Sequence, residues 1–496
     1  MPHNIQRKLW KISEPDIDAS ARITTQLRIS PLLAQILTTR GIDTVAKAQK
    51  YLYPELSQMY SPYLLHDMAK AVDRLRSAID NQEKIYIYGD YDVDGTTSIA
   101  LLLEVIEYIS QGRLQTQYYI PDRFDEGYGL NKYVVEQLHE KGCQLLITVD
   151  CGVTAIEEIE LANNLGMDVI VIDHHQPRPD AAPSACAVID PKLEECEYPY
   201  NNLSAVGLAF KFAHALFDEE ELPPVLKSQL DLVALGTVAD VVPLTGENRL
   251  LAKFGLEEIN KRNRIGIKAL CDLLEYKSEI TSYTLGFVIG PRLNAAGRLD
   301  TARNVVELLT SKSYESARKI AEQLDEFNRK RRKIEDEIHN QAVAKVKKDV
   351  DLEKDKGIVL SSPNWHSGVI GIVASRIVEK FYRPVFLISI DEEECRGSGR
   401  SIPEFDMAKS LNECADLMID YGGHQAAAGL TIEKENIPKF RKRFNKVACS
   451  KLSDEDIIPK IRVDLETSAE LLTLQSVEEL KIQASNSVIR ILTNGE

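Results

Sequence analysis

The sequence predicts an α/β fold built around a parallel β-sheet that has helices on both faces. Four short apolar runs of the kind that form buried strands occur between residues 85 and 189, and helical patterns separate most of them. Continuous apolar strands that alternate with helices are typical of parallel sheets covered on both sides. Each run also ends at Gly or Asp, and ligands of such sheets bind beyond the carboxyl ends of the strands.

The other elements follow in order along the chain. Residues 1–80 are mixed and look helical, and residues 203–289 have a mainly helical pattern. Residues 313–350 form a long polar stretch with few helix breakers, which predicts a connector helix. A second α/β unit begins at Gly357 and continues to about Ser450. The predicted strands of the first sheet are 85–88, 145–149, 169–172 and 187–189.

Composition limits the class of protein. A length of 496 residues suggests about three domains, and 44% hydrophobic with 27% charged residues is ordinary for a globular protein. No apolar run is long enough for a membrane span, and the first residues lack the apolar core of a secretory signal. Eight cysteines without a pairing rhythm indicate reduced thiols, so we expect a cytoplasmic protein without membrane association.

The formal net charge of −16 argues, taken alone, against a nucleic-acid partner. However, a metal site made of carboxylates adds negative charge to this count, and its bound ions reverse the sign where a substrate would lie. Local clusters of charged residues therefore say more about nucleic-acid binding than the net charge does.

Three acidic residues follow the first predicted strand. Asp90, Asp92 and Asp94 alternate within Gly89–Gly95. A solvated turn would explain the pattern by itself. At the mouth of a buried sheet, however, like charges repel unless a cation lies between them, so the position favours a metal site.

The second and third strands end in a similar way. Asp150 follows the second strand, where it is either a helix cap or a metal ligand. Asp173, His174 and His175 follow the third, and imidazole is a common metal ligand. An Asp can also accept a hydrogen bond from a ligating ring and fix its tautomer. The alternative is a histidine pair with a purely structural role.

Asp240 is the one charged residue in an apolar segment, 236–243. A buried carboxylate is costly unless it is paired or bound to a metal, so Asp240 is a further ligand candidate.

Oxygen ligands with some imidazole suit manganese or magnesium, and the histidine favours manganese. Two such ions about 3.5–4 Å apart form the clamp used for phosphate-ester hydrolysis. The sequence has no Gly-x-x-x-x-Gly-Lys-Ser/Thr loop and so does not support an ATP motor of that type.

These motifs resemble the DHH phosphoesterase family, which is named for a triplet like that at 173–175. Within the family, the chain is similar to the single-strand-specific DNA exonucleases over about residues 30–470. The other motifs that carry the resemblance are GDYDVDGTTS (89–98), VDCG (149–152), GTVADVVPL (236–244), GPRLNAAGRL (290–299), SGVIGIVASR (367–376), RGSGRS (396–401) and GGHQAAAG (422–429).

The resemblance implies roles for these residues and an activity. His175 would contact the scissile phosphate or an ion. Asp173 would orient the metal ligands without binding the ions itself, and Asp94 would take part in catalysis together with these two residues. The activity would be 5′→3′ degradation of single-stranded DNA to mononucleotides in repair and recombination. We expect a monomer with a single-strand-binding protein and a RecQ-type helicase as partners. The residues expected to hold two manganese or magnesium ions are Asp90, Asp92, Asp94, Asp150, His174 and Asp240.

Three further stretches are candidates for strand binding. Arg292, Asn294 and Arg298 lie among small residues, and arginines can grip phosphates in a bidentate manner, although a solvated surface turn is the alternative. Ser398, Arg400 and Ser401 belong to a stretch that suggests an anion-binding nest. Gly423 and His424 are expected in a glycine loop that opens a tightly packed helix, where His424 would meet phosphate or have a structural role.

The resemblance also divides the chain. The expected segments are an N-terminal helical region (1–80), a DHH phosphoesterase domain (81–305), a connector helix (306–350), a DHH-associated substrate-binding domain (351–450) and the remnant of an oligonucleotide-binding domain (451–496). The barrel pattern starts at Ile461 and fades after Leu480, so we expect an incomplete barrel and a weaker grip on long strands.

Two other readings are open. A DHH phosphoesterase could act instead on short oligoribonucleotides, cyclic dinucleotides or 3′-phosphoadenosine phosphate. A non-catalytic replication scaffold could also retain the fold, but decay of that kind should remove ligands, and every expected acid and histidine is present.

Overall fold

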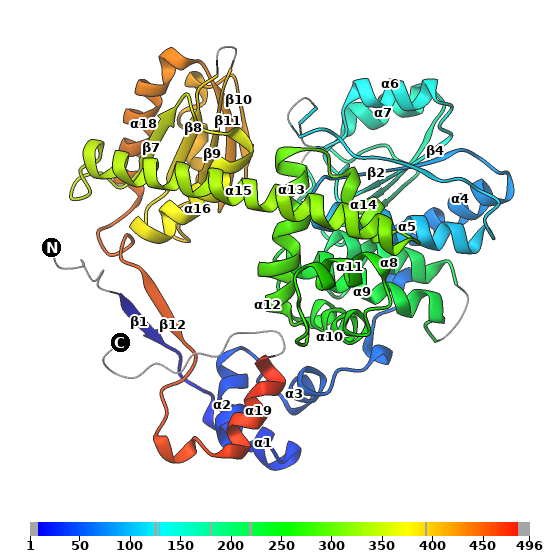
Figure 1. Ribbon diagram of the computed structural model, residues 1–496. Coiled ribbons are helices and arrows are strands. Elements are labelled where there is room, and N and C mark those ends of the chain that lie inside the picture. Colours follow the sequence, from blue (N-terminus) through cyan, green and yellow to red (C-terminus); the bar gives the residue numbers. More distant parts are fainter. Residues whose placement is uncertain are drawn as a thin grey trace. The chain divides into compact units, whose positions relative to one another are not determined.

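The structure, a computed structural model, describes residues 8–123, 126–127, 129–178, 181–217, 221–391 and 394–484, with only the backbone for 481–484. The chain forms two compact units (Figure 1). The larger unit contains the described residues of Asp16–Asn328 and Thr467–Glu496, and the smaller unit contains those of Met1–Pro15 and Arg329–Glu466.

The larger unit is built on a five-stranded parallel sheet, as predicted, with the order β3-β2-β4-β5-β6. Its edge strand β3 was not predicted, because its three residues are only partly buried and have no apolar run. The strands are β2 (Ile85–Gly89), β3 (Gln117–Tyr119), β4 (Leu145–Val149), β5 (Asp168–Ile172) and β6 (Ala187–Ile189).

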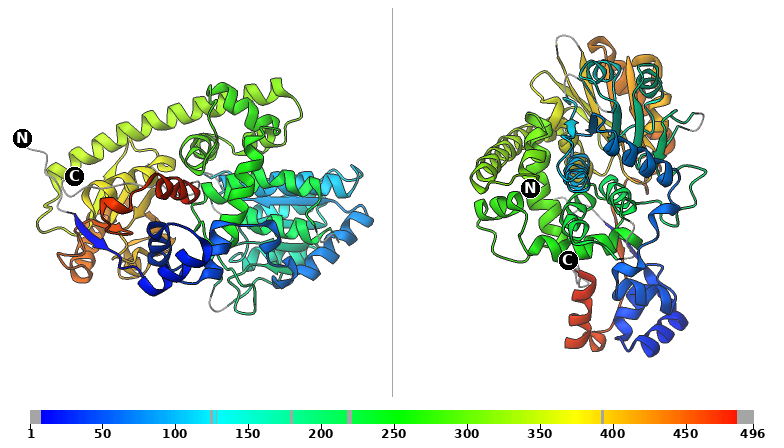
Figure 2. Two further views of the ribbon diagram at one scale, coloured as in Figure 1. Left: turned by 90° about the horizontal axis from the view of Figure 1, so that it is seen from below. Right: turned by 90° about the vertical axis from the view of Figure 1, so that its right-hand side faces the viewer.

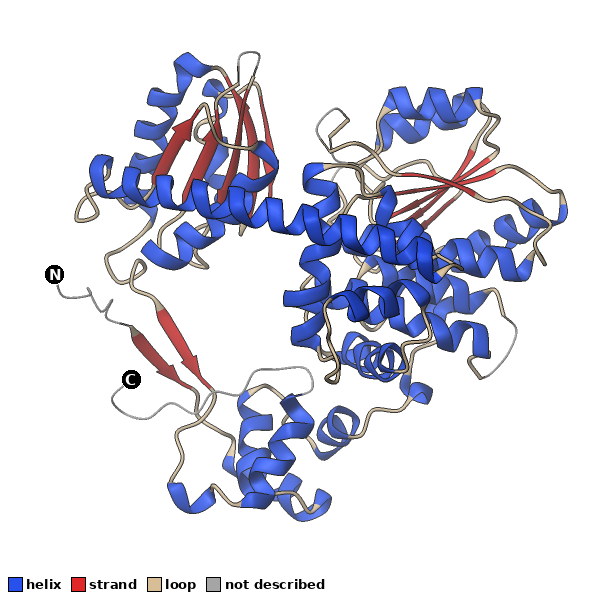
Figure 3. Ribbon diagram, in the orientation of Figure 1, coloured by secondary structure: helices blue, strands red, loops and turns tan. Residues whose placement is uncertain are grey.

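Helices cover both faces of this sheet, which confirms the predicted arrangement (Figure 3). Alternate strand residues supply the two faces. Ile85 and Ile87 pack with α4, α5 and α8, whereas Tyr86 and Tyr88 pack with α6 and α7. The helices are α4 (Met68–Asp80), α5 (Val93–Ile109), α6 (Lys132–Glu140), α7 (Ile156–Asn164) and α8 (Ala205–Ala215).

The order of the strands brings the acidic motifs together. The chain leaves β2 for β3 on one side and returns to β4 on the other, so the strand order changes direction beside β2. A crevice at the carboxyl ends of the strands is expected at such a point. Asp90, Asp150 and Asp173 directly follow the adjacent strands β2, β4 and β5, so these three carboxylates share one edge of the sheet.

A helical layer extends the larger unit, in agreement with the prediction for 203–289. A π-helical turn, η3, connects α12 with α13, so 290–299 is a helix and not a surface turn. The elements of this layer are α9 (Pro224–Ala239), α10 (Gly246–Asn260), α11 (Ile265–Leu273), α12 (Ser282–Thr284), η3 (Leu285–Ile289), α13 (Gly290–Leu299) and α14 (Arg303–Leu309).

The N-terminal region is helical from Ile17 onward, but it begins with a strand. Strand β1 (Leu9–Ile12) pairs in parallel with β12 (Lys460–Val463). The helices are α1 (Ile17–Leu27), α2 (Pro31–Thr39) and α3 (Val45–Leu52), followed by the short turns η1 (Leu56–Gln58) and η2 (Pro62–Leu64).

The C-terminal segment does not confirm the expected barrel. In the described part of 451–496, β12 is followed by the turn η6 (Ala469–Leu471) and the helix α19 (Leu474–Ala484). Helix α19 contacts α2, and the Glu479 carboxylate accepts a hydrogen bond from Ser30 N at 2.8 Å.

The predicted connector is one continuous helix, α15 (Tyr314–Asp349), of 36 residues (Figure 2). Within the basic run 329–333 of this helix, one side chain is buried. Arg331 is buried and forms an ion pair with Glu335 at 3.0 Å, and Glu335 also pairs with Arg376 at 3.0 Å.

The smaller unit contains a five-stranded mixed sheet with the order β10-β11-β9-β8-β7. The end of α15 and α16 cover one face, and α17 and α18 cover the other. Its elements are β7 (Ile358–Ser362), α16 (Ser367–Phe381), β8 (Val385–Ser389), β9 (Cys395–Arg400), α17 (Met407–Asn412), η4 (Ala415–Leu417), β10 (Asp420–Gly423), β11 (Ala427–Ile432), η5 (Lys434–Asn436) and α18 (Ile437–Lys451).

Two local predictions in the smaller unit were wrong. The stretch 396–401 is not a nest, because most of it forms β9, which is paired with β8 on one side and β11 on the other. The stretch 422–429 does not open a helix but forms parts of β10 and β11. The run of small residues suits this sheet, because a β-carbon on Gly399 would lie 2.5 Å from the ring of Phe386.

No helix in the described part of the chain combines the length and the apolar character that a membrane span requires.

Candidate metal centre

Acidic and imidazole side chains that follow β2, β4, β5 and α9, or lie at the start of α5, meet at the carboxyl edge of the larger unit's sheet. They form three overlapping groups in which the potential ligand atoms lie within 4.8 Å of one another. The groups are Asp90 with Asp92 and Asp150, Asp94 with His174 and Asp240, and Asp150 with His174 and His175.

The turn after β2 is fixed by its own carboxylates. Asp92 is the N-cap of α5, and its Oδ1 accepts hydrogen bonds from Asp94 N at 2.8 Å and Gly95 N at 3.0 Å. Asp94 points toward the start of α8, where its two oxygens accept hydrogen bonds from Ala205 N at 2.7 Å and Val206 N at 2.9 Å. The positive end of α8 therefore stabilises the Asp94 carboxylate.

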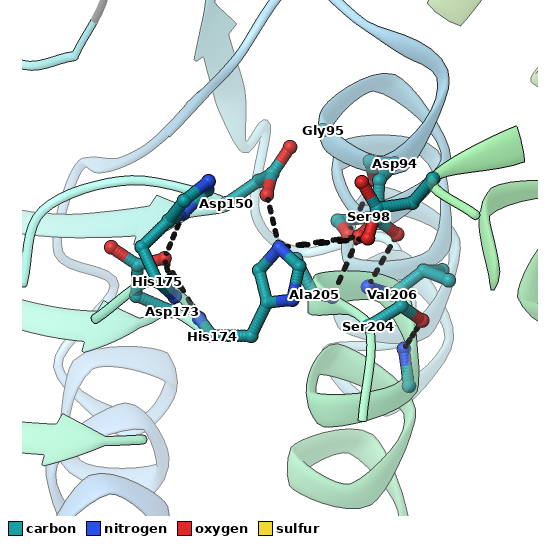
Figure 4. Close-up of polar contacts among 12 residues, drawn as sticks. Asp94, Gly95, Ser98, Asp150, Asp173, His174, His175, Ser204, Ala205 and Val206 are labelled. Carbon is teal, nitrogen blue, oxygen red and sulfur yellow. Dashed lines mark hydrogen bonds and ion pairs between the residues drawn. The ribbon is translucent and has the colours of Figure 1, made fainter. Parts of the chain in front are cut away.

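His174 lies among the carboxylates. Its Nε2 is 3.2 Å from Asp150 Oδ1 and 3.9 Å from Asp94 Oδ2 (Figure 4). It is also 3.8 Å from Asp240 Oδ2. Burial, followed by the neighbouring His175, lowers the pKa of His174 to about 3, so the ring is neutral. Its backbone hydrogen bond is with Leu203, and Nε2 has no hydrogen-bond partner among the described residues. Nε2 therefore carries the lone pair that a metal ion requires.

Asp173 organises the two histidines. Its Oδ1 accepts hydrogen bonds from His174 N at 2.7 Å and from His175 N at 3.1 Å, and its Oδ2 accepts one from Val153 N at 3.0 Å. Oδ1 also lies 2.7 Å from His175 Nδ1. Burial opposes protonation of His175, but the hydrogen bond and charge of Asp173 outweigh burial and raise the pKa of the ring. Asp173 thus holds the backbone of both histidines and the ring of His175.

The carboxylates crowd one another in a buried place. Burial, followed by neighbouring acids, raises the pKa of Asp90, Asp94 and Asp150 well above the usual range. Burial, followed by Asp92, raises the pKa of Asp240 to about 7. The repulsion between buried like charges of this kind is reduced when cations lie between them.

These residues fit divalent ions. Asp90 Oδ1 is buried and, like His174 Nε2, has no hydrogen-bond partner in the described part of the chain. Native proteins rarely leave buried polar atoms unsatisfied, so two such atoms in one acidic cluster indicate an absent partner. Several carboxylate oxygens with one or two imidazoles form the donor set that manganese or magnesium takes.

The predicted strand-binding residues of α13 have internal partners. Asn294 Oδ1 accepts a hydrogen bond from Val93 N at 3.2 Å. Arg292 Nε pairs with Asp325 at 2.9 Å, and Arg292 Nη1 donates to Val288 O at 2.6 Å. Arg298 lies close enough to Tyr91 to lower the pKa of its hydroxyl, although burial and Asp90 raise that pKa to about 12 overall. Helix α13 therefore lies against the metal-binding turn.

The predicted residues of the smaller unit form two local groups. Arg400 Nη1 donates to Ser398 Oγ at 3.2 Å and to Gly399 O at 2.7 Å. The Ser401 hydroxyl donates to Phe405 O at 2.7 Å. Gly423 and His424 lie at the β10–β11 turn, where His424 N donates to Ala427 O at 2.8 Å.

Two neighbouring residues were not predicted as part of the site. Asp190 follows β6, is fully buried, and has an Oδ2 without a hydrogen-bond partner in the described chain. Lys192 donates to the His174 carbonyl and, with Gln176 and Tyr198, lines a pocket of about 470 Å³. The signal was present for Asp190, because its strand ends like those before Asp90, Asp150 and Asp173.

Comparisons with known proteins agree with this geometry. The DHH family N-terminal domain matches residues 84–237, and the DHHA1 domain matches residues 354–449. The single-stranded-DNA-specific exonuclease RecJ of Bacillus subtilis is 42% identical over 95% of this chain and 59% of the relative. That of Haemophilus influenzae is 39% identical over 91% of this chain and 80% of the relative.

Among solved structures, RecJ of Thermus thermophilus in complex with Mn²⁺ superimposes with a TM-score of 0.83 and 29% identity. The match covers 97% of this chain and 68% of that chain. The chain thus spans about three fifths of the Bacillus relative and about four fifths of the Haemophilus relative. On these matches and on the motifs that meet at the metal centre, the chain belongs to the RecJ family of DHH phosphoesterases.

Proposed function

We propose that this protein is a metal-dependent exonuclease that hydrolyses single-stranded DNA from the 5′ end and releases 5′-mononucleotides, in DNA repair and recombination. One observation supports the chemistry above all. The end of β4, the end of α9 and the first turn of α5 place the carboxylates of Asp150, Asp240 and Asp94 within 3.9 Å of a neutral histidine nitrogen that has no hydrogen-bond partner in the described chain. The substrate and the polarity follow from the names of the relatives and the resemblance of the motifs.

Some residues of the site would bind the metal ions, and others would orient the ligands and the substrate. Asp90, Asp92, Asp94, Asp150, His174 and Asp240 would hold two manganese or magnesium ions. Bound ions would lower the pKa of an attacking water and stabilise the leaving oxygen. Asp94 would be held in place by the amides of α8, and Asp173 would hold both histidines in one orientation. His175, whose side chain is 43% exposed, would contact the scissile phosphate through the ring that Asp173 holds.

The strand itself would be held by phosphate contacts. Arg298 on α13 would contribute from the larger unit. In the smaller unit, Ser398 and Arg400 lie side by side on β9, and a β-carbon on Gly371 in α16 would be 2.9 Å from Ser398 Oγ. Hydroxyl and guanidinium donors beside a helix suit a phosphate. We propose that Ser401, Gly423 and His424 extend this phosphate-binding surface.

The decisive experiment follows mononucleotide release from single strands labelled at either end, with manganese present or removed by chelation. Release should require the metal and begin at the 5′ end. Asp92→Asn is the sharpest variant, because an asparagine keeps the helix cap but removes a ligand charge. We expect this variant to fold normally and to lose at least about a hundredfold in rate. Undiminished activity would contradict the assignment.

The same assay separates the other readings. An enzyme for short oligoribonucleotides or cyclic dinucleotides would prefer dinucleotide RNA to long DNA, and a scaffold would hydrolyse neither. Strand selectivity can be measured with blunt duplexes of equal length, which should be cleaved far more slowly.

Further predictions concern the protein's surroundings. We propose a cytoplasmic monomer that works with a single-strand-binding protein and a RecQ-type helicase. All eight cysteines are unpaired, which supports a reducing compartment. We also propose that the segment from Ile461 is related to the start of an oligonucleotide-binding barrel, which affinity for long single strands relative to a longer family member would test.

A further inference from the structure

Asn294 makes the contact that completes the metal-binding turn. The first four amides of a helix have no partner within the helix. In α5, Asp92 Oδ1 accepts hydrogen bonds from the amides of Asp94 and Gly95, and the regular helical bonds begin with Thr96 N, which donates to Asp92 O at 2.9 Å. Val93 N, the first amide inside the helix, donates to Asn294 Oδ1 at 3.2 Å. Because Val93 is only 1% exposed, water cannot easily replace this acceptor.

A second contact from the same helix face lies one turn away. A β-carbon on Gly297 would be 2.8 Å from Tyr91 O, so only glycine allows α13 to lie this close to the turn. Asn294 and Gly297 are three residues apart and therefore share one face of α13. This face meets Tyr91 and Val93, the two residues on either side of Asp92.

The sequence explains why α13 presents this face. Pro291 has no amide hydrogen, and its ring would collide with the carbonyl four residues earlier in a regular α-helix. The helix widens into the π-turn Leu285–Ile289 before Pro291, and Gly290 N donates to Leu285 O. Such turns change the direction in which the following helical residues point, and they are frequent at functional sites.

We propose that Asn294 is a positioning residue for the metal centre, and not a strand-binding residue as its motif first suggested. By satisfying Val93 N, it leaves the Asp92 carboxylate oriented toward Asp90 and Asp150, with which it forms one ligand group. Without Asn294, Val93 N would compete for Asp92 and turn this carboxylate away from the ions. The inference rests on the proposed metal centre.

The test measures manganese binding to the chelator-stripped full chain by calorimetry, alongside thermal unfolding and strand cleavage. Asn294→Leu keeps the shape but removes the acceptor, and it should weaken manganese binding about 10- to 100-fold, as the loss of supporting hydrogen bonds does at other metal sites. Asn294→Asp keeps an acceptor oxygen at the N-terminus of α5 and should bind manganese within about threefold of the wild type.

A matched control distinguishes positioning from general stability. Asn260 Oδ1 accepts a hydrogen bond from Ile280 N at 2.8 Å, also between a side chain and a backbone amide of the larger unit. Asn260→Leu should lower the unfolding temperature and leave manganese affinity unchanged. If Asn294→Leu does not fold, Gly297→Ala provides the second perturbation and should also weaken manganese binding.

The outcomes separate the hypotheses. Unchanged manganese affinity in Asn294→Leu, with a raised KM for single strands, would overturn the positioning role in favour of strand binding. Equal weakening by Asn294→Leu and Asn260→Leu would overturn it in favour of a purely structural role. A wild-type protein that binds no manganese would refute the proposed metal centre itself.

Discussion

Oδ1 of Asp94 lies 2.9 Å from the point that a β-carbon on Gly236 would occupy. The same point is 2.4 Å from Thr97 Oγ1, so the close packing of α9 on α5 requires a glycine here. Because Asp240 ends α9, this glycine also determines how closely Asp240 approaches the acids that follow β2.

Gly236→Ala is therefore expected to damage both stability and metal binding. Overpacking of a buried contact typically costs about 1–3 kcal/mol, and the displaced α9 would move Asp240 away from Asp94. Chemical denaturation and manganese titration measure the two effects.

The control for Gly236→Ala is Gly286→Ala, in the same helical layer. A β-carbon on Gly286 would have its nearest neighbour, Val238, at 3.8 Å, which is an ordinary contact. This variant should keep the manganese affinity of the wild type. If both alanine variants bound manganese as the wild type does, close approach at Gly236 would not matter for the site.

Asp173→Asn should change the titration of His175. The charge of Asp173 and its hydrogen bond to Nδ1 raise the pKa of His175, so removal of the charge should lower it. NMR titration of the metal-free protein would measure this shift. In the wild type, Val153 N donates to Asp173 Oδ2, and in the variant it would face the amide group of the asparagine instead. Because this buried amide loses its acceptor, activity should fall as well. An unchanged pKa for His175 would mean that Asp173 does not control the ring.

The sequence predicted the strands that carry the ligands because their apolar runs are continuous and end at acids. It also indicated Asp240 as a candidate ligand, since a lone carboxylate in an apolar segment needs a partner, and this residue lies in a group with Asp94 and His174. It could not predict that Asn294 bonds Val93, because this contact spans 201 positions and depends on a π-turn. Strands β10 and β11 were missed because small residues around Gly423 hide the alternation of buried and exposed positions.

Arg264→Met should destabilise the larger unit without impairing the chemistry. The Arg264 side chain is only 9% exposed and pairs with Asp231 at 2.7 Å and Glu104 at 2.8 Å. Removing Arg264 leaves the buried carboxylate of Asp231 without a counter-charge and the partly buried Glu104 without its ion pair, and breaking a buried pair typically costs about 3–5 kcal/mol. Denaturant titration should show this loss, while the rate per folded molecule stays unchanged.

A surface ion pair provides the contrast for Arg264. Lys312 pairs with Glu107 at 2.8 Å, but both side chains are mostly exposed. Lys312→Met should change the free energy of unfolding by less than about 1 kcal/mol. Similar losses of unfolding free energy in the two variants would mean that the ion pairs of Arg264 contribute no more to stability than a surface ion pair.

The crowded carboxylates predict how stability depends on pH when metal is absent. Asp90, Asp94, Asp150 and Asp240 have a raised pKa in the folded state, so the folded protein retains protons that the unfolded chain releases. Stability then falls as pH rises through the folded pKa, which is about 7 for Asp240. His174 has the opposite sign, because its pKa is lowered to about 3, but its contribution is complete above its ordinary value of 6.5.

The chelated protein should therefore lose thermal stability between about pH 7 and pH 8.5, where these carboxylates titrate together with His175 and with Asp190, whose pKa burial raises to about 7. Saturating manganese should reverse this trend, since ions replace the bound protons and bind more tightly as pH rises. Asp240→Asn removes one of the four carboxylates and should flatten the decline in the chelated protein. If the unfolding temperature of the chelated wild type rose over this range, the acids could not be as strongly crowded as their burial implies.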